Sequence, residues 1–546
     1  MLSTLVLTLA GIGMFDALQE QRTFVQLNQV RGIRYSGTHW NRGNRGLTGK
    51  GLGNRLVLSS GIEGPFRISA VLQMNHQTGS AAGVRINQSF FGFEGAKANE
   101  IFLSGDLFGG RRSLGLSSKY FERGSQIQFV VEGDSQTSRY FIDGKLVTTG
   151  NPVPRIDLLE FVPWRSEMTI SSLKVTGKFF ELPELQQRGY SIPTIDLANE
   201  TSRQILVDRE NGQYLGHPTT VLLEDHRTMI CVYPKGHGRG AIVMKRSVDA
   251  GLSWSKRLPT PSTWASSKEV PTLHRVIDRF GKKRLILFSG LYPIRMAYSE
   301  DDGITWSELK KIGDFGGIVT MGCVEEIGPG KYMALFHDDG RFIQEGGIKD
   351  RRFYIYKTES EDGGLTWSAP VVIASHPTAH LCEPGLIRSP NKKQITVLLR
   401  ENSRRYNSFM ISSNDNGKSW SEPRELPASL TGDRHTGKYA PDGRLFISFR
   451  DTTHQTPTPG DWVAWVGTYE DLIEGKEGQY RVRLMDNKKS KDCAYPGVEI
   501  LPNGTFVTTT YGHWTANEAP YIMSVRVKLS EIDQKAKQLR KSKKNQ

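Results

Sequence analysis

The sequence predicts an all-β protein in which a six-bladed β-propeller follows a β-sandwich of the jelly-roll type. Three observations lead to this fold class. An eight-residue motif, Ser-x-Asp-x-Gly-x-Ser/Thr-Trp, occurs four times without a break. A strand–turn–strand pattern recurs six times in the second part of the chain, and short segments of alternating apolar and polar residues fill the first part. Repeats of about 50 residues are typical of propellers, and short alternating strands are typical of sandwiches.

The chain begins with an apolar run, residues 2–15, that has the length of a signal-peptide core but no preceding Lys or Arg. We expect residues 1–20 to direct export, so that the protein is secreted or periplasmic, with a buried strand or an anchor as the alternative. No other segment is long and apolar enough to span a bilayer, which predicts no stable membrane insertion after the signal is removed.

The next part, residues 25–182, contains none of the motif copies. Its alternating segments predict antiparallel strands, and Asp143-Gly144 is typical of a tight hairpin turn. The segment resembles concanavalin-like (laminin-G-like) domains, which often bind carbohydrate; a structural spacer is an equal alternative. Residues 183–196, with Pro183 and Pro193, are predicted to form a linker. The predicted strands of the sandwich are 66–73, 82–86, 127–132, 140–147 and 168–175.

The propeller is predicted over residues 197–530, and the repeated motif supplies its register. Asp, Asn and Gly turn the chain, hydroxyl and carboxylate groups bond turn amides, and the Trp covers the hairpin with a large apolar face. The motif resembles the Asp-box of sialidase-like β-propellers, a resemblance that covers about residues 200–525. The four copies are residues 247–254, 299–306, 360–367 and 413–420, and the six blades are predicted to begin near residues 216, 270, 319, 383, 436 and 495.

The formal net charge is +14, and part of it lies in the predicted basic tail, residues 531–546. This tail is predicted to be a solvated or fraying helix end. No nucleic-acid-binding motif is present, so no nucleic-acid partner is expected. The remaining positive charge favours an acidic substrate through its electrostatic field.

The ends of the inner strands open on one mouth of a propeller, so polar residues at matching points of the blades converge there. Glu383-Pro-Gly and Arg400 resemble a Glu-Pro-Ser-like element and the arginine that follows it in sialidases, and Ala494-Tyr495 resembles the element that carries the nucleophile. The resemblance implies that Tyr495 attacks, Glu383 polarises it and Arg400 binds the substrate carboxylate. A neutral phenol suits this role because a sialic acid carboxylate would repel an anionic nucleophile. A structural ion pair and an inner-wall aromatic are the alternatives, with Tyr511 as the reserve nucleophile.

Further cations are candidates for binding an anionic substrate. Arg450, or alternatively Arg434, is predicted to be another carboxylate-binding arginine, because a planar guanidinium grips a carboxylate through two donors; a solvated surface arginine is the alternative for either. Blade one departs from the family, since His217 stands where the resemblance implies an Arg-Ile-Pro arginine. His217 and the nearby cations Lys235, His237 and Arg239 could rebuild an anion site, which leaves the exact sugar open.

The acid/base residue is predicted to be Glu269, the nearest carboxylate to the start of blade two, and a surface glutamate is the alternative. His337 and Asp338 compete for the role. An acid there needs a raised pKa. Cys231, Cys323, Cys382 and Cys493 are far apart and lack metal-ligand spacing, and no HExxH motif is present, so neither a catalytic metal nor a cofactor is expected, although a bound calcium stays open.

The resemblance implies an exo-acting glycoside hydrolase that releases a terminal acidic sugar, sialic acid or a related one, from a glycan with retention. A non-catalytic carbohydrate-binding or adhesion propeller is the first alternative. A polysaccharide lyase or other glycosidase that uses His217 or His237 with Tyr495 is the second, because one fold hosts several chemistries.

Overall fold

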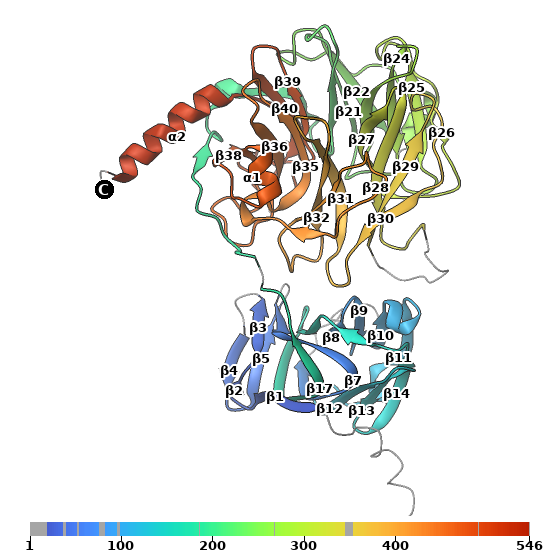
Figure 1. Cartoon of the computed structure of the whole chain (residues 1–546), viewed down its shortest axis with the longest axis vertical. Coiled ribbons are helices and arrows are strands. Elements are labelled where there is room, and N and C mark those ends of the chain that lie inside the picture. Colours follow the sequence, from blue (N-terminus) through green and yellow to red (C-terminus); the bar gives the residue numbers. More distant parts are fainter. Residues whose placement is uncertain are drawn as a thin grey trace, which may run out of the picture. The chain divides into compact units, whose positions relative to one another are not determined.

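The computed structural model describes residues 19–36, 40–51, 54–75, 82–94, 99–184, 186–266, 268–343, 353–489 and 491–544. These residues form two compact units, one up to Glu184 and one from residue 186 onward (Figure 1). Most of the predicted export segment, residues 1–18, lies outside the described residues. Within the described ranges, no helix has the length and apolar character needed to cross a membrane.

The first unit contains two antiparallel sheets, and both contribute to one apolar core that includes Phe91, Phe129 and Tyr140. The predicted strands fall on β7, β8, β12, β13, β14 and β17, and the predicted Asp143-Gly144 turn has positive φ at both residues. The likeness to concanavalin-like domains stays a prediction. One sheet holds β1 (Glu20–Gln26), β2 (Gln29–Val30), β4 (Trp40–Gly43), β5 (Gly46–Lys50), β7 (Ser60–Asn75), β12 (Gln126–Gly133), β13 (Ser138–Ile142), β14 (Lys145–Gly150), β15 (Arg155–Ile156) and β17 (Glu167–Glu181); the other holds β3 (Ile33–Ser36), β6 (Arg55–Leu58), β8 (Gly83–Ile86), β9 (Ser89–Gly92), β10 (Glu100–Ser104), β11 (Arg112–Leu116) and β16 (Leu159–Val162).

The second unit is a six-bladed β-propeller, which confirms the predicted fold class (Figure 1). Each blade is an antiparallel sheet whose strands follow one another in sequence from the axis outward. Blades 1 to 3 consist of β20 (Thr219–Leu222), β21 (Met229–Pro234) and β22 (Ile242–Ser247); β23 (Thr272–Ile277), β24 (Lys283–Ser289), β25 (Arg295–Ser299) and β26 (Lys310–Lys311); and β27 (Ile318–Gly328), β28 (Lys331–Asp338), β29 (Tyr354–Ser360) and β30 (Val371–Ser375). Blades 4 to 6 consist of β31 (Leu381–Arg388), β32 (Ile395–Glu401), β33 (Phe409–Ser413) and β34 (Arg424–Glu425); β35 (Gly432–Tyr439), β36 (Leu445–Asp451), β37 (Trp462–Gly467) and β38 (Tyr480–Met485); and β39 (Gly497–Ile500), β40 (Thr505–Gly512) and β41 (Tyr521–Lys528).

Two strands that precede blade 1 complete the last two blades. β19 (Gln204–Asp208) pairs antiparallel with β41 as the outer strand of blade 6, and β18 (Thr194–Asp196) pairs parallel with β38 of blade 5. The predicted linker, residues 183–196, is therefore wrong at its C-terminal end. Arg188 also forms a 2.9 Å ion pair with the half-buried carboxylate of Glu425 in β34.

Two helices lie at the rim of the propeller, one beside blades 4 and 5 and the other beside blades 5 and 6. α1 (Tyr469–Glu474) follows β37, and α2 (Leu529–Lys544), red in Figure 1, follows β41. The first turns of α2 pack against the propeller rather than lying in solvent, because Leu529, Ile532 and Ala536 are buried in the core of blades 5 and 6. The tail prediction missed this apolar stripe, which has helical spacing beneath the basic residues.

All four copies of the repeated motif form the same turn after the third strand of blades 1 to 4. The first Ser donates to the Asp carboxylate at 2.7–2.8 Å, and the same carboxylate oxygen accepts from the backbone N–H of the following Ser or Thr at 2.9 Å. The copy in blade 2 also joins blade 1, since Arg246 of β22 donates to the Asp302 carbonyl at 2.7 Å and Gly303 packs against Ile230. The motifs therefore tie blade to blade.

The inner strands carry a recurrent distortion near the axis. Five blades have a non-glycine residue with positive φ where the inner strand begins or just before it: His217, Val319, Glu383, Arg434 and Ala494, with φ of 49–56°. In β27, β31 and β35 the pairing register shifts at this point. Such a conformation costs about 1–3 kcal/mol per residue and re-aims neighbouring side chains, as bulges beside functional sites do. This point of the inner strands is where the candidate site lies.

Candidate active site

A cavity of about 240 Å³ gathers polar side chains from five of the six blades. We call it the Tyr495 cavity. Seven of the residues named from the sequence as candidates for catalysis or binding line it together, although they are spread from residue 217 to residue 495. Its polar lining consists of His217, His237, Glu269, His337, Asp339, Arg341, Glu383, Arg400, Asn402 and Tyr495.

Tyr495 and Glu383 form the centre of this cavity. The Tyr495 hydroxyl donates a hydrogen bond to Glu383 Oε1, and both side chains are almost completely buried. Arg400 Nη1 donates to the same Glu383 oxygen at 2.5 Å and reaches the Tyr495 oxygen at 3.3 Å. The phenol therefore has a hydrogen-bond acceptor for its proton and a cation beside its oxygen.

A fully buried carboxylate, Asp433, organises the arginines behind this pair. It accepts from Arg404 at 2.6 and 2.8 Å, from Arg450 at 2.8 and 2.5 Å, and lies 3.2 Å from Arg400 Nε. Burial alone would raise the pKa of Asp433, but the three guanidinium groups hold it well below its ordinary value. Asp433 is thus the counter-charge that fixes the arginine cluster.

Arg450 does not reach the Tyr495 cavity as a free carboxylate-binding group. Besides its bonds to Asp433, its Nη1 donates to the backbone carbonyls of Lys491 and Cys493 at 2.7 and 3.2 Å. Four of its five N–H groups are therefore occupied within the protein, because Arg has only five donors. Its guanidinium carbon instead lies 5.8 Å from the centre of the Tyr495 ring.

The structure places the other predicted cations in different environments. Arg434 lines a second cavity on the propeller axis, and Arg239 is exposed. Lys235 is bound to Glu210 at 3.0 Å. His237 lines the Tyr495 cavity and hydrogen-bonds to Tyr214 at 2.7 Å.

Burial shifts the pKa values of Tyr495 and Glu269, the two groups that would transfer protons. It raises the pKa of Tyr495 well above its ordinary value, with the neighbouring Glu383 charge acting in the same direction. It also raises the pKa of Glu269 above 4.5, again with help from the Glu383 charge. The phenol is therefore held protonated, and Glu269 keeps its proton to a higher pH than an ordinary glutamate.

A chain of aromatic and acidic residues supports the far side of Tyr495. The ring of buried His217 packs edge-on against the Tyr495 ring with centroids 4.6 Å apart, and His217 Nε2 lies 3.2 Å from the Tyr511 hydroxyl. Asp492 accepts from the Tyr214 hydroxyl at 2.7 Å and contacts His513 Nε2 at 2.8 Å. Tyr511, the reserve nucleophile, thus lies in a supporting layer behind His217.

The glycine of the Glu383-Pro-Gly element, Gly385, is required for a steric reason. A Cβ at this position would clash with the carbonyl oxygen of His435 on the neighbouring inner strand. The close approach of β31 and β35 therefore requires glycine where the resemblance implies a serine-like residue.

Several residues of the site escaped the sequence reasoning. Asp339 and Arg341 lie directly after β28 and pair at 2.7 Å, and Asn402 accepts from Arg400 Nη2 at 2.6 Å. The strand-end sequence Asp-Asp-Gly-Arg was a usable signal, because polar residues after a propeller strand can face the mouth. Of the predicted competitors, His337 lines the cavity, whereas buried Asp338 accepts from the backbone N–H groups of Phe342 and Ile343 at 3.1 Å and shapes the loop.

Comparisons with known proteins agree with this architecture. Residues 287–507 match the family described as a BNR repeat-like domain. No curated protein is similar enough in sequence to match the chain. Similar solved structures include a protein of unknown function from Dyadobacter fermentans (13% identity, 59% of this chain and 97% of that one, TM-score 0.50) and a Penicillium chrysogenum α-L-arabinanase in complex with arabinobiose (15%, 60% and 98%, 0.45).

A point mutant of the NanB sialidase from Streptococcus pneumoniae is also similar (11% identity, 87% of this chain and 99% of that one, TM-score 0.42). At 13% identity the likeness to the Dyadobacter fermentans protein concerns the fold alone. The segment that matches the BNR repeat-like domain, residues 287–507, lies within the six-bladed propeller.

Proposed function

We propose that this protein is a retaining glycoside hydrolase that releases a terminal acidic sugar from a glycan. The observation that carries the proposal is the buried hydrogen bond from the Tyr495 hydroxyl to Glu383, with Arg400 beside both oxygens. A tyrosine paired with a carboxylate is the arrangement a nucleophile needs when the substrate itself bears a negative charge at the reacting carbon.

In the first step Tyr495 attacks the anomeric carbon and its proton passes to Glu383. Because the pKa of Tyr495 is raised, the phenol does not ionise beforehand, so attack and proton transfer occur together. The guanidinium of Arg400, 3.3 Å from the phenol oxygen, favours the negative charge that develops there. Glu269 donates its proton to the leaving glycosidic oxygen, which releases the rest of the glycan.

In the second step Glu269, now ionised, takes a proton from a water molecule that attacks the same carbon. The bond to Tyr495 breaks, and Glu383 returns its proton to the phenol oxygen. Two displacements at one carbon retain its configuration. The raised pKa of Glu269 supports this dual role, since the residue must be protonated first and ionised afterwards.

An acidic sugar is favoured by the charge around Tyr495. Arg400, Arg434 and Arg450 lie beside Tyr495, and Arg404 is bound to Asp433. Against the two carboxylates Glu383 and Asp433, these four arginines leave a formal excess of two positive charges. Arg400 and Arg341 line the Tyr495 cavity and are the arginines we assign to the substrate carboxylate. This grip differs from the one that the family resemblance implies, because Arg450 is bound to Asp433.

The proposal is tested with a methylumbelliferyl α-sialoside and with matched fluorogenic uronides, comparing the wild type with Tyr495→Phe. Sugar release by the wild type that is lost in the variant supports it. Glycan binding without release at any pH favours the binding-protein alternative. The packing of His217 against Tyr495 favours a lyase as the second candidate, and its signature is an ultraviolet-absorbing unsaturated uronate formed from an acidic polysaccharide.

A further inference from the structure

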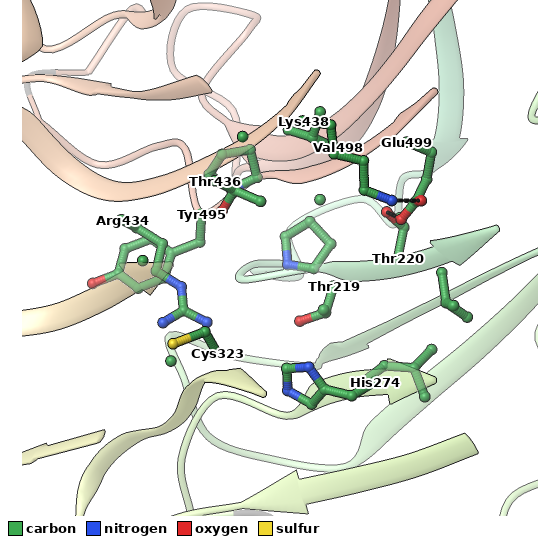
Figure 2. Close-up of a pocket in the computed structure, with 18 of the residues that line it drawn as sticks. Thr219, Thr220, His274, Cys323, Arg434, Thr436, Lys438, Tyr495, Val498 and Glu499 are labelled. Carbon is green, nitrogen blue, oxygen red and sulfur yellow. Dashed lines mark hydrogen bonds and ion pairs between the residues drawn. The ribbon is translucent and has the colours of Figure 1, made fainter. Parts of the chain in front are cut away.

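A second cavity, of about 350 Å³, lies on the propeller axis and is lined by the inner strands of all six blades. We call it the axial cavity. Arg434 enters it from β35, and Figure 2 shows its guanidinium reaching toward Cys323 of β27, beside the Tyr495 ring. Arg434 is only 8% exposed, and its guanidinium carbon lies 6.0 Å from the Tyr495 ring centre.

Arg434 is a buried cation without a counter-charge. In the part of the chain that the structure describes, its Nη1 has no hydrogen-bond partner, and no carboxylate forms an ion pair with it. Its cation–π contact with Tyr495 does not neutralise the charge. Burying a charged group is costly unless it is paired, so this arrangement predicts a missing anion.

The other ionisable groups of the axial cavity do not supply that anion. Lys438 and Glu499 form their own ion pair at 2.6 Å, shown in Figure 2, and Arg275 pairs with Glu224 and Asp302 on its outer side. Burial, with the Arg434 charge acting in the same direction, lowers the pKa of His274 to about 3. Burial also raises the pKa of the Cys323 thiol to about 12.

His435 and Tyr495 complete the set of ionisable groups that line this cavity. Burial lowers the pKa of His435 to about 4, so its ring is neutral, and burial keeps the Tyr495 phenol protonated. At neutral pH the unbalanced charge in the axial cavity is therefore the single positive charge of Arg434.

We propose that the axial cavity binds one small monovalent inorganic anion, of the halide or nitrate class, against the Arg434 guanidinium. A single charge matches the single unpaired guanidinium, whereas sulfate or phosphate would bring a second negative charge that Lys438, already held by Glu499, does not balance. The hydroxyl of Thr436 and the thiol of Cys323 line the same space as further donors. This inference rests on Arg434 and does not depend on the proposed hydrolase activity.

The test uses the full chain in two measurements. In the first, Tm is followed while sodium bromide replaces sodium gluconate at constant ionic strength. A ligand that binds only the folded state gives a saturating rise in Tm, here expected at about 2–5 °C. In the second, crystals are soaked in sodium bromide and the anomalous signal is mapped. We expect a bromide peak in contact with the Arg434 guanidinium.

Three variants sharpen the result. Arg434→Met removes the charge and should abolish the saturating Tm response, Arg434→Lys should keep it in weakened form, and Lys310→Met, an exposed cation of β26, should leave it intact. A bromide response that is unchanged in Arg434→Met, a wild type that responds to sulfate but not to bromide, or soaked crystals without a peak at Arg434 would each overturn the proposal. If Arg434→Met does not fold, Arg434→Lys and the anomalous map decide.

Discussion

Asp433 accepts two hydrogen bonds from Arg404, at 2.6 and 2.8 Å, and thereby anchors one side of a buried cluster that also contains Arg400 and Arg450. The charge of this carboxylate holds three guanidinium groups next to the Tyr495 cavity. Several expected outcomes depend on it and on the groups it positions.

Removing the charge of Asp433 should destabilise the protein strongly. In Asp433→Asn, buried Arg450 and Arg400 lose their counter-charge, so we expect a loss of about 3–5 kcal/mol in the free energy of unfolding. Asp442→Asn is the matched control, since its pair with Arg444 is half exposed and should cost less than about 1 kcal/mol. Urea unfolding measures both, and equal losses would contradict the organising role of Asp433.

Tyr495 and Glu383 should act as a unit. Tyr495→Phe removes the nucleophile, and Glu383→Gln removes the proton acceptor and should lower kcat by about 10²–10⁴-fold. Because the two groups share one step, the double variant should be no slower than Tyr495→Phe alone. The measurement is kcat and KM for the substrate, followed through the sugar that is released. If Tyr511→Phe abolished release while Tyr495→Phe retained it, the assignment of the nucleophile would be wrong.

Glu269 should set the alkaline side of the pH profile. Glu269 must be protonated to donate its proton, and its pKa is raised above 4.5. We therefore expect kcat/KM to be high below this pKa and to fall as the pH rises through it. Glu269→Gln should remove that fall from the profile.

The same variant should lose far more activity on a natural glycan than on an aryl glycoside, because a phenol leaves without protonation. Equal losses on the two substrates would assign the acid to another group.

The repeated motif should be sensitive to a single methyl group where it touches the neighbouring blade. Gly303 has φ of 80°, and a Cβ there would lie 2.5 Å from Ile230 Cδ1; Gly281 has φ of 83° and open space around it. We expect Gly281→Ala to cost about 1–2 kcal/mol from backbone strain alone. Gly303→Ala should cost about 1–3 kcal/mol more from the clash. Thermal or urea unfolding of the two variants isolates the contact between the blades, and equal costs would refute it.

The fold was more accessible from the sequence than the site. The four motif copies and the recurring strand–turn–strand pattern are local signals, and they were enough to predict the class and the blade starts. Convergence of Tyr495, Glu383, Arg400, Glu269 and His217 followed from the register of the blades. Their catalytic and binding roles stay predictions.

What the sequence could not show is which arginine binds which carboxylate. Three arginines occupy similar positions at or beside the ends of strands near the axis, but their side chains have different partners. Arg450 is bound to Asp433, Arg434 enters the axial cavity, and Arg400 lies beside Tyr495. Arg434 itself has a positive φ of 56°, which changes the direction of its side chain relative to a regular strand. Neither periodicity nor spacing records such distortions in non-glycine residues.

The pairing of β19 with β41 has a consequence for the order in which the chain can fold. The ribosome delivers β18 and β19 before any blade, but their partners, β38 and β41, belong to the last two blades. Until β38 and β41 have been synthesised, β18 and β19 therefore expose unpaired strand edges, and such edges can pair with other chains. A nascent chain interrupted before residue 521 would keep β19 unpaired, so premature termination should yield aggregates rather than a smaller propeller.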